Sequence, residues 1–132
     1  MSEPILYLDR SVIRSPDLAR LRESVADLTE FVREREPQLL FYGFEIDEQT
    51  ATMRVVAVHP DSESLGVHLD VGGSEFRKVG AFIDLQQIDI YGRPSAAVLG
   101  QLHEKAAMLG SAARVSVHEL ASGFERLTTL GH

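Results

Sequence analysis

The sequence predicts an α+β fold with the element order β-α-β-β-α-β, followed by an extra helix and strand. Two observations predict it. Segments rich in β-branched and aromatic residues alternate with amphipathic stretches, and a short polar turn joins the second strand to the third. This order is the ferredoxin-like motif, an antiparallel four-stranded sheet with both helices on one face. The 132 residues show no repeat and no low-complexity linker. We therefore expect a single domain, residues 1–132, with its core at about 4–93 and the C-terminal extension at about 94–128.

The first strand is predicted over residues 5–14, a run dense in β-forming side chains. Ser15 then caps a helix with Pro16 at its first position. This helix ends at about Glu36, because Pro37 disfavours the helical conformation of the residue before it. An apolar stripe at three- and four-residue spacing runs along it: Leu18, Leu21, Val25, Leu28 and Val32.

Residues 38–47 and 51–59 are predicted to form the next two strands. The polar turn between them, residues 47–50, predicts an antiparallel hairpin. Asp61 or Ser62 caps the second helix, which we expect to break or bend at Gly72 and Gly73 and to resume over residues 74–83. Residues 85–92 then complete the core as its fourth strand.

The C-terminal extension is predicted to add a third helix and a fifth strand. Pro94 and Ser95 begin the helix, Gly110 ends it, and the strand follows at residues 114–120. The apolar stripe of this third helix consists of Val98, Leu99, Leu102, Ala106 and Leu109.

The central hairpin is apolar on both faces, although the two core helices cover only one of them. In the second strand, one face carries Leu40, Tyr42, Phe44 and Ile46, and the other carries Leu39 and Phe41. A contiguous apolar patch rarely remains in water, so we expect a homodimer in which a second copy covers the open face. The rival explanation is that the C-terminal helix and strand fold back over that face. We expect instead that they reach across and extend the sheet edge of the partner.

Composition narrows the classes of protein. A net charge of −7 disfavours binding to nucleic acid, whose phosphates attract clustered Lys and Arg. No apolar run approaches the roughly 20 residues that span a bilayer, so no membrane partner is expected. Glu3 stands where a signal peptide favours positive charge, and the chain has no Cys. We therefore expect a cytoplasmic protein.

One stretch carries a family resemblance. Residues 37–70, PQLLFYGFEIDEQTATMRVVAVHPDSESLGVHLD, resemble the antibiotic biosynthesis monooxygenase-like group of dimeric α+β barrel proteins. The matching features are a Glu-Pro helix end, an aromatic strand that ends in an acidic turn, and a Val-rich strand. An Asp-Ser-Glu helix start then leads to a His-Leu pair in the second turn. The resemblance covers about the first ninety residues and implies a dimeric α+β barrel. Members of the group include cofactor-independent oxygenases acting on polycyclic aromatic phenols, haem-degrading enzymes and small-aldehyde processing proteins.

The resemblance implies a pocket between the sheet and the second helix, with His68 pointing toward the ligand. The near-neutral pKa of histidine suits a general base that removes a phenolic proton, so His68 is the first candidate catalytic residue. Tyr42 is a candidate for presenting a hydroxyl to the pocket, and Arg54 for orienting a substrate anion. The alternatives are structural: a hydrogen-bonded histidine at the core edge, a packed tyrosine and a solvated edge arginine. His59 ends the third strand before Pro60, where we expect it to face solvent or cap the turn.

The resemblance implies a small cofactor-independent monooxygenase that acts on an aromatic or other oxidisable apolar molecule. One alternative is a non-catalytic dimeric barrel that binds a small apolar ligand, and another is a haem-binding protein that uses His68 as the iron ligand. The chain contains no Asn and no Trp, residue types that haem-degrading members pair with that histidine. Histidine spacing favours no zinc site, so we expect no metal. The resemblance to cofactor-independent oxygenases implies that no cofactor is bound.

Overall fold

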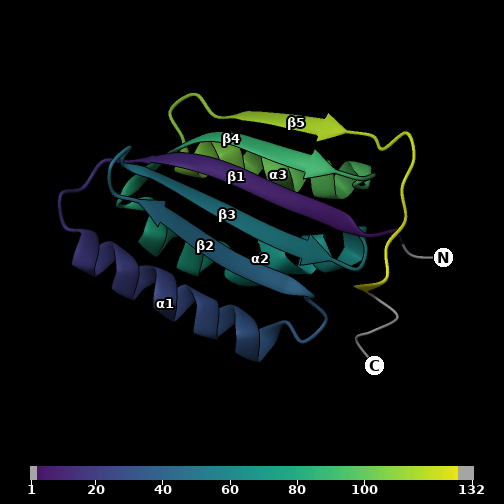
Figure 1. Ribbon diagram of the computed structural model, residues 1–132, viewed down its shortest axis with the longest axis horizontal. Helices are drawn as coiled ribbons and strands as arrows, with labels where there is room; N and C mark the ends of the chain where they lie inside the picture. Colours follow the sequence, from purple (N-terminus) through teal and green to yellow (C-terminus); the bar gives the residue numbers. More distant parts are fainter. Residues whose placement is uncertain (1–2, 128–132) are drawn as a thin grey trace.

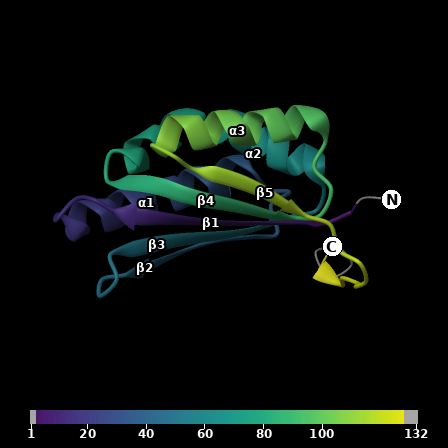
Figure 2. The ribbon, with the colours of Figure 1, turned by 90° about the horizontal axis from the view of Figure 1, so that it is seen from above.

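The computed structural model describes residues 3–127, so the outermost residues of the predicted domain, 1–2 and 128–132, lie outside it. The strands are β1 (Ile5–Ile13), β2 (Phe41–Asp47), β3 (Thr52–His59), β4 (Ile83–Tyr91) and β5 (Arg114–His118). The helices are α1 (Leu18–Arg35), α2 (Ser62–Gly80) and α3 (Ala96–Leu109). They form two layers, with one sheet in front of the helices in Figure 1 and all three helices on the same side of it in Figure 2.

The sheet has the strand order β2-β3-β1-β4-β5. Its first four strands pair antiparallel, which confirms the predicted ferredoxin-like core and its β2–β3 hairpin. The expectation for the C-terminal extension was wrong. β5 pairs with β4 of its own chain, in parallel. A parallel pair needs a crossover over a sheet face, and α3 makes that crossover beside α2 on the face that α1 and α2 already cover.

The helix ends follow local chemistry. Asp17, not Ser15, caps α1 and accepts a hydrogen bond from the backbone N–H of Arg20. Asp61 caps α2 in the same way at Ser64. α2 does not break at Gly72 and Gly73. A Cβ at Gly72 would lie 2.4 Å from Cζ of Phe76, so glycine there makes room for an aromatic ring inside a continuous helix.

The core lies between the sheet and the helices. Strand alternation directs alternate residues of β1 and β3 toward the helices, and the stripes of α1, α2 and α3 meet them. The opposite face of the sheet keeps apolar side chains at its surface, because no described element packs on it. Among those more than a third exposed are Leu6, Val12, Phe41 and Val56.

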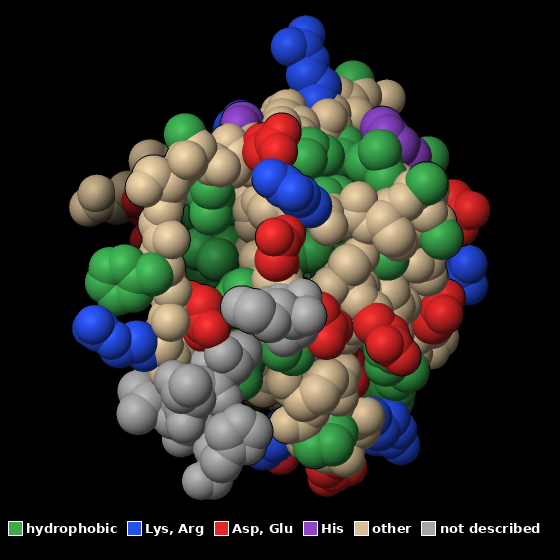
Figure 3. All heavy atoms as spheres, turned by 90° about the vertical axis from the view of Figure 1, so that its right-hand side faces the viewer, with side chains coloured by type: hydrophobic (Ala, Val, Ile, Leu, Met, Phe, Trp, Pro, Cys, Tyr) green, Lys and Arg blue, Asp and Glu red, His purple; other side chains and the backbone are tan. Residues whose placement is uncertain are grey.

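The charged side chains lie mainly at the surface. Seen from the end of the sheet where β1 begins, acidic and basic side chains are interspersed with apolar ones (Figure 3). Among residues 3–127, no helix is both long enough and apolar enough to cross a membrane.

Candidate functional site

A group of polar and ionisable side chains is buried between the sheet and the helices. Burying a charged group costs free energy unless it is paired, so such a group inside an apolar core has a functional or structural reason. We call these residues the polar cluster. They come from β1, the end of α1, β3, α2 and α3, and are Asp9, Glu36, His59, Ser64, His68 and Lys105.

His68 and Glu36 form the centre of the polar cluster. Nδ1 of His68 lies 2.9 Å from both carboxyl oxygens of Glu36, and the two side chains are 1% and 0% exposed. Glu36 follows the last residue of α1 as its C-cap and precedes Pro37, with backbone angles that are no longer helical. His68 lies on the second turn of α2, among its buried residues. The end of one helix and the face of another therefore bring these two residues together across 32 positions of sequence.

Burial controls the charges of this pair. It lowers the pKa of His68 to about 3, and the positive charge of Lys105 acts in the same direction. Burial also raises the pKa of Glu36 to about 7, against the opposing effect of Lys105. The imidazole is therefore neutral at neutral pH. Protonated Glu36 donates its O–H to Nδ1 of His68, whereas after ionisation of Glu36 the proton lies on Nδ1, which donates to the carboxylate. Ionised Glu36 accepts the Nδ1–H bond, which leaves the lone pair of Nε2 free to act as a base.

Aromatic rings surround His68. Tyr42 lies edge-on with its ring centroid 5.1 Å from that of His68, and Phe76 lies at 5.1 Å on another side. The structure thus brings together two of the three candidate residues, His68 and Tyr42. Burial and the nearby charges of Asp9 and Glu36 raise the pKa of Tyr42 well above its usual value, so its hydroxyl stays protonated and can donate a hydrogen bond.

The structure does not bring Arg54 to this site. Arg54 alternates with the buried Met53 and Val55, so it lies on the opposite face of the sheet. Its guanidinium forms an ion pair with Glu45 at 2.9 Å, and about half of the side chain is exposed. Within one chain it therefore cannot orient a ligand that lies against His68.

His59 corrects another expectation. It is fully buried rather than solvent-facing, because it continues the inward alternation of Met53, Val55 and Ala57. Nδ1 of His59 lies 2.8 Å from Oγ of Ser64, and Nε2 is buried without a hydrogen-bond partner among the described residues. Burial lowers its pKa to about 3, and the neighbouring His68 adds to this shift. Its ring centroid is 5.5 Å from that of His68, so the two neutral imidazoles pack side by side.

Asp9 and Lys105 form a second part of the polar cluster that sequence reasoning missed. The hydroxyl of Tyr7 donates to Oδ2 of Asp9 at 2.5 Å, while Oδ1 of Asp9 is buried without a partner among residues 3–127. Lys105 reaches inward from α3, and its Nζ lies over the rings of Tyr7 and Phe76 at 4.6 and 4.2 Å from their centroids. Burial lowers the pKa of Lys105, and the negative charges of Asp9 and Glu36 oppose that shift.

A signal for both residues was present in the sequence. Asp9 stands in phase with Tyr7 and Ser11, which alternate inward in β1. Lys105 stands seven residues after Val98 and three after Leu102, within the buried stripe of α3. A charged residue at a position that the periodicity assigns to the core marks a candidate site.

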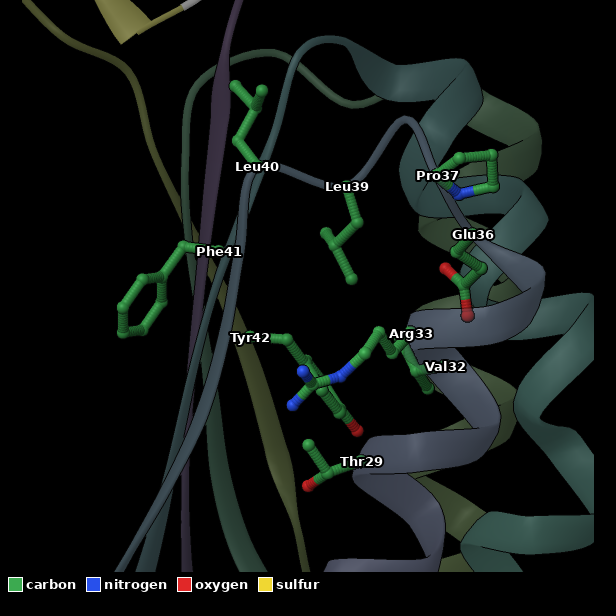
Figure 4. A pocket seen from close by; sticks show the side chains of 9 residues that line it. All are labelled: Thr29, Val32, Arg33, Glu36, Pro37, Leu39, Leu40, Phe41 and Tyr42. Carbon is green, nitrogen blue, oxygen red and sulfur yellow. The ribbon is translucent and has the colours of Figure 1, made fainter. Parts of the chain in front are cut away.

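Three hollows adjoin this region. A groove of about 330 Å³ lies between α1 and β2, lined by residues 29, 32, 33, 36, 37 and 39–42. In Figure 4, Tyr42 and Leu39 point into this α1–β2 groove, whereas Phe41 points away. A groove of about 310 Å³ lies between α2 and α3 and reaches Phe76 and Lys105. A smaller hollow of about 20 Å³ is lined in part by Asp9, Tyr42, Phe76 and Lys105. None of these three hollows has His68 among its lining residues, so the pocket expected at that histidine is filled by neighbouring side chains.

The residues present do not fit a haem. None of the three hollows has His68 among its lining residues, and the hollow beside the ring's neighbours, about 20 Å³, is the size of a water molecule, far below that of a macrocycle. Among the described residues, no group of three or more His, Cys, Asp or Glu side chains is arranged to hold a metal ion.

Solved structures of other proteins share this architecture, although no sequence comparison finds a match. Neither a protein-family model nor a curated protein sequence matches the chain. Among solved structures, MupZ from Pseudomonas fluorescens is 18% identical with a TM-score of 0.72, over 95% of this chain and 96% of that one. A putative antibiotic biosynthesis monooxygenase from Caulobacter crescentus is 16% identical with a TM-score of 0.60, over 67% and 88%. SnoaB, a cofactor-independent oxygenase from Streptomyces nogalater, is 12% identical with a TM-score of 0.59, over 72% and 97%.

The chain has the antibiotic biosynthesis monooxygenase-like fold. The fold expected from the resemblance of residues 37–70 is thereby confirmed. The MupZ match spans nearly the whole chain and so takes in most of α3 and β5, whereas the other two span about the length of the β1–β4 core. The C-terminal extension, and with it the helix that carries Lys105, therefore has a counterpart in one of these structures. At these identities the likeness concerns the fold.

Proposed function

We propose that this protein is a small cofactor-independent oxygenase in which His68 is the general base. The observation that supports this most is the buried contact between Nδ1 of His68 and Glu36, which leaves Nε2 as the free nitrogen of a neutral imidazole. A base of this kind removes a proton from an acidic O–H or C–H group of a ligand. The ligand class is an aromatic or other oxidisable apolar molecule, because the walls around His68 are aromatic rings.

The reaction needs no bound cofactor. The O–H or C–H bond of the ligand breaks, its proton passes to Nε2, and the electron pair stays on the ligand. The resulting anion is the reductant for molecular oxygen. For an anthrone-type ligand, a CH₂ group becomes C=O, one oxygen atom is retained and the other leaves as water. Tyr42, whose hydroxyl stays protonated, donates a hydrogen bond to the ligand oxygen.

Oxygen uptake by the purified protein tests this proposal. We expect consumption of oxygen with a panel of anthrone- and quinol-type compounds, and loss of consumption in His68→Ala. His103→Ala is the matched control, because His103 is an exposed histidine on α3. The rate should rise with pH through about 7 as Glu36 ionises. Uptake that is equal in wild type and His68→Ala contradicts the proposal.

A second candidate is a non-catalytic protein that binds a small apolar ligand. The observation that favours it is the α1–β2 groove of about 330 Å³, which is lined by Val32, Leu39 and Leu40 among others but not by His68. This candidate predicts that a panel compound raises the unfolding temperature while no product forms. A reproducible product in a mass-spectrometric screen contradicts it.

We also propose that the protein works as a homodimer whose sheets face each other. The exposed apolar side chains on the helix-free face support this, because contiguous apolar patches seldom remain in water. The patch centres on Leu6 in β1, Phe41 in β2 and Val56 in β3, which are neighbouring strands. A second copy is the occupant whose surface repeats the same apolar pattern, as a two-fold interface requires.

Sedimentation velocity tests the dimer. Val56→Glu places a charge on the helix-free face and should shift the protein to monomer. Val67→Glu is the matched control, because Val67 on α2 is 39% exposed and Val56 is 37% exposed. A wild-type protein that sediments as a folded monomer at micromolar concentration contradicts the dimer.

A further inference from the structure

The α1–β2 groove has room for the apolar part of a small ligand. Val32 lines it from α1, and Pro37, Leu39 and Leu40 line it from the segment that leads into β2. In Figure 4, Leu39 and Tyr42 point into the groove. Its volume of about 330 Å³ lies within the range of small-molecule sites.

The polar groups that the groove leaves unused are hydrogen-bond donors. The hydroxyl of Tyr42 stays protonated and forms no hydrogen bond with a described residue. Arg33 extends from α1 toward β2 in Figure 4, and its ion pair with Glu30 uses only Nε, at 3.2 Å. Both side chains of that pair are more than half exposed, so the pair is weak and the two terminal nitrogens of Arg33 remain available.

The acid in the groove is already engaged. Glu36 is the acidic residue among the lining side chains, and both of its carboxyl oxygens lie 2.9 Å from Nδ1 of His68. A ligand cation would have to compete with that contact, whereas a ligand anion finds the donors of Arg33 and Tyr42 unused. The charge pattern of the groove is therefore complementary to an anion.

We propose that the α1–β2 groove binds a small apolar carboxylate, whose carboxylate group is held by Arg33 and Tyr42. The apolar part of the ligand lies against Val32, Leu39 and Leu40. This rests on the second candidate function, for which it names the ligand class and two binding residues. A carboxylate suits Arg33 because the planar guanidinium group presents two parallel donors to its two oxygens.

Binding of a carboxylate in this groove is linked to the protonation of Glu36. The ligand brings a negative charge and excludes water from the groove side of Glu36, and both effects raise the pKa of that carboxyl group. In the free protein the pKa is about 7, so at pH 8 most of the protein has released this proton, and the complex takes it up again. The affinity should therefore fall as the pH rises above 7.

The other groups around Glu36 do not produce the same dependence. The charged and titratable groups that surround it, directly or through His68 and Tyr42, are Arg33, Tyr42, His68, Lys105, Asp9 and His59. The pKa of His68 is about 3 and that of Tyr42 lies well above its usual value, so neither changes its charge near pH 7. All of these groups are retained in Glu36→Gln, so a comparison with wild type isolates Glu36.

Isothermal titration calorimetry with two probes tests the inference. The probes are 2-naphthoate and its neutral isostere 2-naphthamide. We expect wild type to bind 2-naphthoate about tenfold more tightly than 2-naphthamide at pH 7, and Arg33→Gln to remove that preference. Arg35→Gln is the matched control and should keep it, because Arg35 is also an exposed arginine in the last turn of α1 but does not line the groove.

Proton uptake locates the bound carboxylate. The binding enthalpy of 2-naphthoate at pH 8 is compared in phosphate and Tris buffers, which differ in ionisation enthalpy. We expect wild type to take up roughly 0.4 protons for a rise of about one pKa unit at Glu36, and Glu36→Gln to take up none.

The outcomes separate the inference from the function on which it rests. Equal affinity for the two probes overturns the carboxylate inference and leaves the second candidate function standing, whereas binding of neither probe counts against both. A preference for 2-naphthoate that persists in Arg33→Gln, or proton uptake that persists in Glu36→Gln, also overturns the inference, because the carboxylate then lies elsewhere.

Discussion

Replacing Glu36 by glutamine removes a buried acid whose ionisation is linked to folding. Burial raises its pKa from 4.5 to about 7. Between these two values the folded protein holds a proton that the unfolded chain has released. The stabilising contribution of Glu36 is therefore fully present below pH 4.5 and is lost as the pH rises through about 7. At about 1.4 kcal/mol per pKa unit, the wild-type free energy of unfolding should fall by roughly 2–3 kcal/mol from this group between about pH 5 and pH 8.

The free energy of unfolding of Glu36→Gln should not show this pH-dependent fall. Relative to wild type, the variant should therefore gain roughly 2–3 kcal/mol of stability between about pH 5 and pH 8. Urea denaturation at both pH values, at one fixed protein concentration, measures the difference. His68 titrates in the unfolded chain of both proteins, so its contribution to the pH dependence of stability cancels when wild type and Glu36→Gln are compared. Glu34→Gln is the control, since Glu34 is an exposed glutamate of the same helix and should show no such trend. A wild-type and Glu36→Gln difference that is the same at both pH values would refute the buried-acid account.

Four further substitutions test other parts of the structure. Gly72→Ala should cost about 1–3 kcal/mol of stability in thermal or urea unfolding, because its Cβ would overlap Phe76, whereas Gly73→Ala meets no atom within 4 Å and should stabilise the helix by up to about 1 kcal/mol. His59→Asn keeps a partner for Ser64 but removes a group that resists protonation when buried, so the loss of stability between about pH 7 and pH 5 should shrink by about 2 kcal/mol. Lys105→Met should lower the free energy of unfolding at neutral pH, because it removes the positive charge that favours ionisation of the buried carboxyl groups of Asp9 and Glu36.

Much of the fold could be predicted from local patterns. The stripes of α1 and α3, the β2–β3 hairpin and the order of the core elements follow from periodicity and turn residues, and the structure confirms them. The proximity of His68 and Tyr42 was expected from the family resemblance, which implies a pocket at His68. Placing β5 required information that no local pattern carries. Whether a terminal strand joins its own sheet or that of a partner depends on how α3 packs across the sheet.

The partners of the site residues could not be predicted in the same way. Glu36 reads in the sequence as a helix end before proline, and only the packing of α1 on α2 turns its carboxyl group onto His68. Asp9 and Lys105 stand in core phase, yet periodicity does not reveal that they share one cavity with Tyr42. Arg54 lies on the outward phase of β3, which assigns it to the surface.

The account as a whole depends on a neutral imidazole held by a buried carboxyl group. Long-range ¹H–¹⁵N NMR of protein labelled at histidine reads the protonation of each ring nitrogen of His68 directly. We predict no imidazolium form of His68 between about pH 5 and pH 8, with the proton moving from Nε2 to Nδ1 as Glu36 ionises near pH 7. A doubly protonated His68 at about pH 6 would contradict both the proposed base and the chemistry built on it.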